Sequence, residues 1–114
     1  MKRIELKNDC YKKIKYNDKE KTKIDYEFYF DSKDEWHRLN DPARIWYYTS
    51  GNIELEEYCI NDRLHRLEGP AQISYYESGE IHHEGYWING EKYLKEEFYK
   101  LINIERNLKL LNKK

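Results

Sequence analysis

The chain repeats a 28-residue pattern, and this repeat limits the fold more than any other feature of the sequence. The segment HRLNDPARIWYYTSGNIELEEYCIN, which starts at His37, aligns without gaps on HRLEGPAQISYYESGEIHHEGYWIN, which starts at His65. His-Arg-Leu, Pro-Ala, Tyr-Tyr, Ser-Gly and Ile-Asn recur at equivalent places. Repeats of roughly 20–50 residues are typical of supersecondary units that bury their apolar faces only by stacking side by side. The two copies are therefore expected to form equivalent, neighbouring units.

Each copy is predicted to form a β-hairpin. The shared Tyr-Tyr-x-Ser-Gly-x-Ile segment provides a three-residue loop in which Gly51 or Gly79 takes a positive φ. Pro42 and Pro70 stand where the first strand of each hairpin begins, so they remove no hydrogen bond from the ladder. The predicted strands are residues 43–48 and 52–60 in the first copy and residues 71–76 and 80–88 in the second. Further turns are expected at Asn61-Asp62 and Asn89-Gly90.

The two ends of the chain complete the predicted fold. IDYEFYFD, residues 24–31, is expected to be one strand of a degenerate N-terminal hairpin, with YKKIKY, residues 11–16, as its partner. From Leu94 onward the apolar spacing is that of an amphipathic helix. The expected fold class is mainly β (α+β), a hairpin meander of about six antiparallel strands in a single sheet with a C-terminal α-helix packed on one face. The expected divisions of a single domain, 1–114, are the degenerate hairpin 1–35, the first repeat 36–63, the second repeat 64–92 and the helix 93–111.

Alternation along the strands predicts two different sheet faces. With Tyr48 opposite Asn52, one face is expected to be the drier one and to lie under the helix. Its residues in the first copy are Ala43, Ile45, Tyr47, Ile53 and Leu55. The wetter face is expected to carry Trp46, Tyr48, Glu54, Glu56, Tyr58 and Ile60. In this register the cross-strand partners of Glu56 and Glu84 are Arg44 and Gln72.

The composition agrees with a sheet that is one layer thick. Only 39% of the residues are hydrophobic, against roughly 45–50% in typical globular domains, so a large core is excluded. Twelve tyrosines and three tryptophans supply much of the apolar area. Such side chains can pack on one side and stay hydrated on the other.

Charge is segregated along the chain. Residues 1–23 carry nine Lys or Arg against four Asp or Glu, residues 24–97 carry seven against seventeen, and residues 98–114 carry five against one. The three segments therefore have net charges of +5, −10 and +4. An acidic middle suits a basic partner, and the pI of about 6.4 for the whole chain argues against direct nucleic-acid binding as the main activity.

The repeat resembles the MORN-like β-hairpin repeats, in the variant written HRxDGPA…YYxxGxIxxExYxxNG that is found in phages, giant viruses and bacterial antitoxin or immunity-type proteins. The resemblance covers residues 24–99 and includes the KEEF segment, residues 95–98, with which a helix opens in that variant. This sequence departs from the pattern at Asp41 and Asp62, which replace glycines, and at Leu94, which has no capping Ser beside it. Because such repeats are scaffolds, the resemblance implies a fold more than an activity.

Candidate catalytic and metal-binding groups are few. His37 and His65 occupy the same repeat position, so we expect them to tie the loops between hairpins. His82 and His83 are adjacent and would point to opposite faces of a strand, so they cannot chelate one ion. The two cysteines lack a metal or redox spacing and are expected to be reduced. No catalytic residue, metal site or cofactor is expected, and the chain is predicted not to be an enzyme.

The expected function is that of a non-enzymatic protein-binding inhibitor, encoded by a phage or mobile element and acting in the cytoplasm of the bacterial host without membrane association. It would block a defence nuclease, like an anti-CRISPR protein, or neutralise a toxin, like an antitoxin or immunity protein. The expected partner is a protein with a basic nucleic-acid-binding groove, bound through aromatic anchors on an acidic face. The expected partner-binding residues are Trp46, Tyr48, Glu54, Glu56, Tyr58, Tyr76, Glu84 and Tyr86.

Three alternatives remain open. The basic N- and C-terminal segments could serve an RNA-binding or membrane-surface adaptor. A small hydrolase could use His82 or His83 in a cleft between helix and sheet. An unpaired sheet edge could join two copies in a homodimer.

Overall fold

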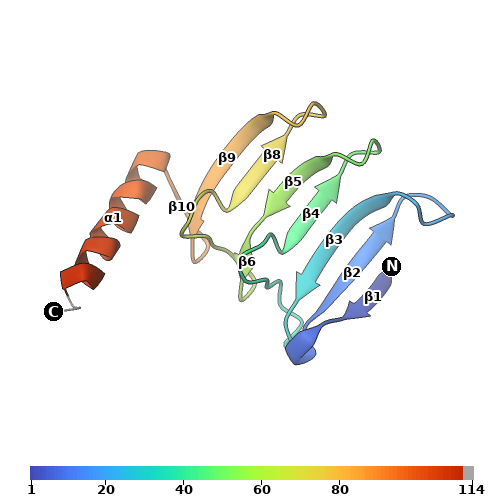
Figure 1. Ribbon diagram of the computed structural model, residues 1–114, viewed down its shortest axis with the longest axis horizontal. Coiled ribbons are helices and arrows are strands. Elements are labelled where there is room, and N and C mark those ends of the chain that lie inside the picture. Colours follow the sequence, from blue (N-terminus) through green and yellow to red (C-terminus); the bar gives the residue numbers. More distant parts are fainter. Residues whose placement is uncertain (112–114) are drawn as a thin grey trace.

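The computed structural model describes residues 1–111 as one antiparallel sheet followed by a helix (Figure 1). The eight strands of the sheet follow one another in chain order. They are β1 (Lys2–Glu5), β2 (Tyr11–Tyr16), β3 (Ile24–Phe30), β4 (Arg44–Tyr47), β5 (Ile53–Glu57), β8 (Gln72–Tyr75), β9 (Ile81–Ile88) and β10 (Glu91–Tyr93). The remaining elements are the 3-10 turn η1 (Lys7–Asp9), the two-stranded ribbon of β6 (Cys59–Ile60) and β7 (Arg63–Leu64), and the helix α1 (Lys95–Leu111).

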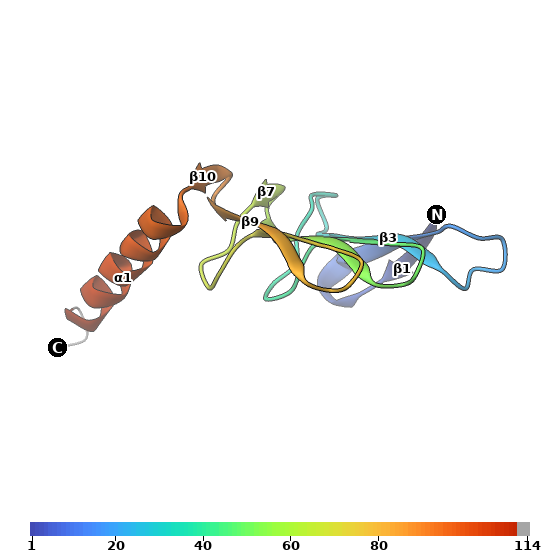
Figure 2. The same ribbon diagram turned by 90° about the horizontal axis from the view of Figure 1, so that it is seen from above.

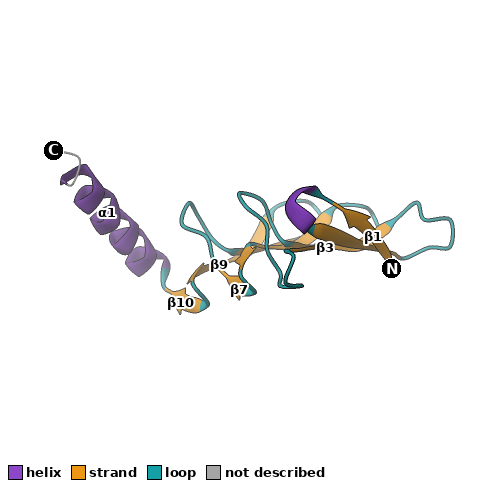
Figure 3. Ribbon diagram, turned by 90° about the horizontal axis from the view of Figure 1, so that it is seen from below, coloured by secondary structure: helices purple, strands orange, loops and turns teal. Residues whose placement is uncertain are grey.

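The molecule is elongated because almost all of it is one sheet. Its principal extents are 57 × 35 × 21 Å, and views along the sheet show a single layer of strands with the helix beyond one end (Figure 2, Figure 3). The predicted mainly β fold, hairpin meander and C-terminal helix are confirmed. The predicted number of strands is too low, since β1 and β10 extend the sheet at its two edges. These two strands have four and three residues, and neither lies within one of the predicted strands.

The two repeated hairpins close as the sequence predicts. The turn glycines Gly51 and Gly79 have φ values of 97° and 95°. The amide of Tyr48 donates to the carbonyl of Asn52, and the amide of Gly51 donates to the carbonyl of Tyr48, both at 2.9 Å. The second hairpin repeats both bonds at the same distances. The two copies therefore have equivalent turns.

A β-bulge follows each of these turns. Trp46 pairs with Leu55 but Tyr47 pairs with Ile53, so Glu54 is an extra residue that β4 does not match. His82 occupies the same place in the second hairpin. Because side chains alternate between the two faces of a sheet, one inserted residue moves every side chain beyond it to the opposite face from the one predicted.

The predicted faces and cross-strand pairs are therefore wrong beyond the bulge. Glu56 lies opposite Ile45, on the face that was expected to be drier. Arg44 lies opposite Glu57 instead of Glu56. The same one-residue shift overturns the predictions for Leu55, Gln72 and Glu84.

The loops between hairpins are tied by the repeated histidine and arginine. Nδ1 of His37 accepts a hydrogen bond from the amide of Asn61 at 3.1 Å, and Nδ1 of His65 accepts one from the amide of Asn89 at 2.9 Å. The guanidinium group that follows each histidine donates to the carbonyl of the repeat's proline, at 3.2 Å in the first copy and 3.1 Å in the second. The predicted loop-tying role of both histidines is confirmed.

The helix packs on the end of the sheet. The prediction that it covers the drier face is wrong. Phe98 and Ile102 are buried against Tyr86, with Ile88 and Tyr93 packed around them. Beyond these contacts α1 extends past the strands (Figure 1, Figure 2). Two buried helical side chains can anchor one strand but cannot span several.

The first turn of the helix is stabilised without the missing serine. Oε1 of Glu97 accepts a hydrogen bond from the amide of Leu94 at 3.3 Å, which is one half of a capping box. Among residues 1–111, no helix is both long and apolar enough to cross a lipid bilayer.

We expect Phe98→Ala to detach the helix and leave the sheet folded. Phe98 is 0% exposed, and truncating a buried phenylalanine costs about 3–5 kcal/mol. The truncation removes one of the two helical side chains that are buried against the sheet. Circular dichroism should show a weaker helical signal, and hydrogen exchange should accelerate in residues 95–109 only. Leu108→Ala, at an exposed position of the same helix, is the control. Loss of protection throughout the sheet would contradict this prediction.

Candidate functional site

Glutamate and isoleucine alternate across one face of the sheet. The register places one residue from each of six strands in a single row: Ile14, Glu27, Ile45, Glu56, Ile73 and Glu84. Neighbouring strands lie about 4.8 Å apart, so the three carboxylates recur about every 10 Å. We name this row and its flanking tyrosines the glutamate–tyrosine face. The flanking tyrosines are Tyr29, Tyr47, Tyr58, Tyr75 and Tyr86.

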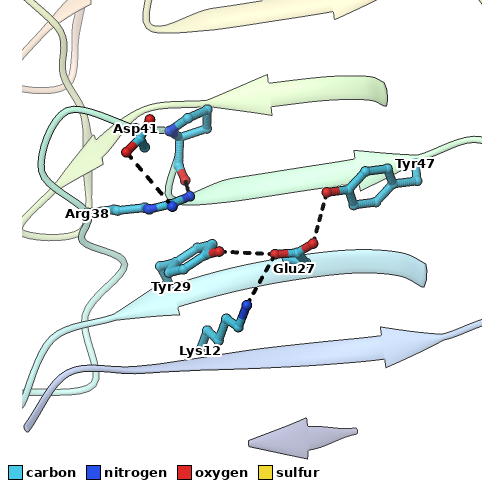
Figure 4. A network of polar contacts seen from close by, with 7 residues as sticks. Lys12, Glu27, Tyr29, Arg38, Asp41 and Tyr47 are labelled. Carbon is cyan, nitrogen blue, oxygen red and sulfur yellow. Dashed lines mark hydrogen bonds and ion pairs between the residues drawn. The ribbon is translucent and has the colours of Figure 1, made fainter. Parts of the chain in front are cut away.

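Tyrosine hydroxyls from successive hairpins bind these carboxylates. Tyr47 donates to Oε1 of Glu27 at 2.9 Å, and Tyr29 donates to Oε2 at 3.1 Å (Figure 4). Tyr75 donates to Oε1 of Glu56 at 2.5 Å. The Tyr47 and Tyr75 bonds run from one hairpin to the hairpin before it. Side chains thus reinforce the backbone pairing between units.

Cationic side chains lie over this face as well. The guanidinium of Arg38 lies 3.8 Å from the ring centre of Tyr29, and that of Arg66 lies 3.9 Å from the ring centre of Tyr58. Nζ of Lys12 lies 3.9 Å from the nearest carboxylate oxygen of the β3 glutamate (Figure 4). The glutamate–tyrosine face therefore carries both positive and negative side chains. Its carboxylates are regularly spaced among the cations.

Burial and hydrogen bonding hold the tyrosine protons in place. Burial, and then the bond to Glu27, raises the pKa of Tyr47 well above its ordinary value. Burial and the bond to Glu56 do the same to the pKa of Tyr75. Burial, followed by the interaction with the Tyr99 hydroxyl, raises the pKa of Tyr86 to about 12. These hydroxyls therefore remain donors well above neutral pH.

The structure separates the residues that were predicted to form one binding face. Glu56, Tyr58, Glu84 and Tyr86 belong to the glutamate–tyrosine face. Trp46 lies on the opposite face, in the cross-strand row of Leu55 and Tyr26. The prediction of a single surface is wrong for this residue because the bulge was not foreseen.

The other three predicted residues lie near the hairpin turns. Glu54 is the exposed extra residue of the first bulge. The hydroxyl of Tyr48 donates to the carbonyl of Tyr75 at 2.7 Å, which links the two repeated hairpins. The ring of Tyr76 lies 4.6 Å from that of His82. These positions form the rim of the sheet at its turn end.

The opposite face gathers aromatic rings and cations, of which only Trp46 was among the predicted partner-binding residues. Tyr26 stacks on Phe28 with ring centres 4.3 Å apart, and Phe28 meets Trp46 edge-on at 5.2 Å. The guanidinium of Arg44 lies 4.5 Å from the ring centre of Trp36. Lysines of β2 lie opposite these rings in the register. We name this surface the aromatic–cation face; its residues are Lys13, Lys15, Tyr26, Phe28, Trp36, Arg44 and Trp46.

A buried carboxylate fixes the centre of the aromatic–cation face. Glu57 is only 6% exposed. It forms an ion pair with Arg44 at 2.7 Å and accepts a hydrogen bond from Gln72 at 2.7 Å. The sequence contained one signal for the aromatic–cation face. Lys13 and Lys15 alternate in YKKIKY, and the partner strand IDYEFYFD has alternating aromatics, so pairing of the two strands places rings beside these lysines.

Cysteines and histidines are the remaining candidates for metal binding or catalysis in the described residues. In residues 1–111, no three His, Cys, Asp or Glu side chains are grouped so as to hold a metal ion. Cys10 and Cys59 are free thiols, and burial raises the pKa of Cys59 to about 11. His82 and His83 line a groove of about 450 Å³ beside β9. The hydrolase alternative stays a prediction that these observations do not test.

Comparison of the chain with protein families, curated proteins and solved structures finds no match. The resemblance to MORN-like repeats therefore rests on the repeat pattern alone and stays a prediction.

We expect stability to fall at alkaline pH because the folded chain holds its tyrosine protons. Above about pH 10 the unfolded chain releases protons that Tyr47 and Tyr75 retain, so the free energy of unfolding decreases as pH rises. Tyr47→Phe and Tyr75→Phe should weaken this dependence and should each cost about 1–2 kcal/mol at neutral pH through the lost hydrogen bond. Urea unfolding at several pH values measures both effects. Tyr76→Phe, at an exposed position, is the control, and an unchanged pH dependence in the first two variants would contradict the prediction.

We also expect a loss of stability at mildly acidic pH through His65. Burial lowers the pKa of this imidazole below its ordinary value of 6.5, and its Nδ1 must be unprotonated to accept from Asn89. As pH falls below about 6.5 the unfolded chain binds a proton that the folded chain excludes, so the free energy of unfolding decreases. His65→Gln should flatten this dependence between about pH 7 and 5, whereas the exposed control His82→Gln should keep it. Equal slopes in the two variants would refute the assignment to His65.

Proposed function

We propose that the chain is a non-enzymatic inhibitor that binds a protein through the glutamate–tyrosine face. The observation that carries the proposal is the row of Glu27, Glu56 and Glu84, in which a carboxylate recurs at every second strand. Grooves that hold a nucleic-acid backbone are lined with Lys and Arg. A regular row of carboxylates on a sheet is complementary in charge to such a groove. The proposed partner is therefore a protein with a basic nucleic-acid-binding groove.

Inhibition of this kind requires no chemistry from the chain. A molecule 57 Å long and 21 Å thick can lie along a groove and exclude the nucleic acid from it. Tyrosines beside the carboxylates supply amphipathic contact area of the kind that anchors protein interfaces. The proposed partners are a bacterial defence nuclease or a toxin that acts on nucleic acid. The resemblance to MORN-like repeats supports an origin in a phage or mobile element and action in the host cytoplasm.

The test is a cleavage assay with charge-reversed chains. Purified RNA-guided nucleases and toxin nucleases are assayed with and without the protein, and inhibition is compared for Glu56→Lys/Glu84→Lys and for Glu56→Gln/Glu84→Gln. Charge reversal should abolish inhibition. The glutamine pair, which keeps a hydrogen-bond acceptor for Tyr75, should weaken it by an intermediate amount.

A charge-reversed control on the helix separates a local effect from a change in net charge. Glu96→Lys/Glu105→Lys adds the same charge at exposed positions of α1 and should leave inhibition unchanged. Circular dichroism and thermal unfolding confirm that each variant is folded. Equal inhibition by the wild type and by Glu56→Lys/Glu84→Lys would reject the glutamate–tyrosine face as the binding surface.

The aromatic–cation face favours a second function, the binding of single-stranded nucleic acid. Rings that can stack on bases and lysines that can follow a backbone are the two requirements of such sites, and Lys13 and Lys15 lie opposite Phe28 and Tyr26. Lys113 and Lys114, which contribute to the predicted basic C-terminal segment, lie outside the described residues. In the same assays the chain would then inhibit by binding the substrate strand and not the nuclease. Loss of inhibition at higher salt concentration and in Lys13→Glu/Lys15→Glu would support this second function.

A further inference from the structure

One side of β9 is an open strand edge. Its inner side pairs with β8 from Ile81 to Gly85, whereas β10 covers its outer side only from Tyr86 to Ile88. No strand of residues 1–111 pairs with the outer side of Ile81–Gly85. Proteins usually protect such edges with charged side chains, especially Lys, with Pro, or with β-bulges. The sequence Ile-His-His-Glu-Gly contains the bulge at His82 and one glutamate but no Lys or Pro, whereas β1 at one edge of the sheet carries Lys2 and Arg3.

The chain itself shows which kind of strand fits this edge. The equivalent edge of β5 receives β8, with Glu56 opposite Ile73. The edge of β3 receives β4 in the same register, with Glu27 opposite Ile45. The bulge at His82 lies outside the stretch that would pair, because β8 pairs with β5 only over Leu55–Glu57, beyond the equivalent bulge at Glu54.

In both internal examples the added strand also delivers a tyrosine. Two residues after the isoleucine, Tyr47 donates its hydroxyl to Glu27 at 2.9 Å, and Tyr75 donates its hydroxyl to Glu56 at 2.5 Å. Glu84 occupies the corresponding place in β9. Within the described residues no tyrosine hydroxyl donates to Glu84 from a neighbouring strand.

The surroundings of the open edge leave room for a strand. A groove of about 450 Å³ lies beside it, lined by residues 81–86 of β9 and by residues 92–95. Past the edge, α1 continues beyond the sheet (Figure 1, Figure 2). Its side chains Leu101, Ile104 and Leu108 are 42%, 57% and 55% exposed. A strand added to β9 would extend the sheet towards this uncovered apolar surface.

We propose that the open edge of β9 binds an extended segment of a partner protein by strand addition, and that the segment has the pattern Ile-x-Tyr. Its isoleucine would lie opposite Glu84, and its tyrosine hydroxyl would donate to the Glu84 carboxylate. Main-chain hydrogen bonds provide affinity in this mode and side-chain pockets provide selectivity. A second copy of this chain fits less well, because none of the free strand edges of the eight-stranded sheet in residues 1–111, which are Lys2–Glu5, Ile81–Gly85 and the outer side of Glu91–Tyr93, has the pattern Ile-x-Tyr. The inference does not depend on inhibition of a nuclease, since the edge would accept such a segment with or without the proposed function.

The test uses a synthetic peptide with the sequence of residues 69–78, GPAQISYYES, which contains β8. Added to the ¹⁵N-labelled full chain, it should shift and protect the backbone amides of residues 81–85. The peptide with Tyr75→Phe should bind roughly tenfold more weakly or worse, because it loses a hydrogen bond to a charged group. The peptide with Tyr76→Phe is the matched control and should bind like the parent.

A double-mutant cycle assigns the hydroxyl to its acceptor. Glu84→Gln in the protein should weaken the binding of the parent peptide. It should also remove most of the difference in affinity between the parent and Tyr75→Phe peptides. Glu80→Gln, at an exposed position in the same hairpin, should have no effect.

Several results would overturn the proposal. One is an absence of binding at millimolar peptide concentration. Another is a set of amide chemical-shift changes centred on residues 53–57, which would mean that the peptide replaces the chain's own β8. A third is equal affinity of the parent and Tyr75→Phe peptides. Light scattering that shows a concentration-dependent dimer, with protection of residues 81–85 in the absence of peptide, would identify a second copy as the occupant instead. None of these results involves a nuclease, so they are independent of the cleavage assay.

Discussion

A sheet that is one layer thick has no second layer against which to bury its apolar side chains, and this constraint shapes the whole molecule. Each hairpin must therefore bury its apolar side chains against the side chains of the neighbouring strands in the same sheet. The row that alternates Ile45 and Ile73 with glutamates meets this need, because each of these isoleucines is buried between the side chains of two neighbouring strands. A single unit has no such neighbours. The repeat is thus a physical requirement for stability in this architecture.

The side chains that cover the sheet follow the same repeat. Tyr29 and Tyr58 are covered by the arginines of the two His-Arg pairs, Arg38 and Arg66. Tyr86, at the equivalent place in the second repeat, is covered by Phe98 of the helix. The helix therefore takes the place that a further His-Arg loop would occupy. This substitution explains why α1 begins beside Tyr86 at the end of the sheet.

The two faces of the sheet differ in chemistry because of one inserted residue per hairpin. Without the bulge at Glu54, the alternation would place Glu56 beside Trp46. With it, carboxylates join the isoleucine row and the aromatic rings gather with Lys and Arg on the other side. One face thereby has regularly spaced acceptors and the other has rings and cations. The protein therefore has two chemically different surfaces and an open strand edge on β9.

Much of the local structure could be read from the sequence. The repeat, the turn glycines and the changed spacing after Leu94 identified the hairpins, their loops, the equivalence of His37 and His65, and the helix. These features depend on residues close together in the chain. The candidate site was predicted only in part, with Glu56, Glu84 and two tyrosines on the expected acidic face.

The tertiary structure decided the rest. The bulges, the short edge strands β1 and β10, the partner of Arg44 and the position of α1 all depend on which strands pair and in what register. A one-residue shift in pairing costs little in local conformation and yet moves every following side chain to the other face. The sequence by itself therefore determined the elements and their repetition. Only the pairing between strands determined which side chains meet and which surface each one joins.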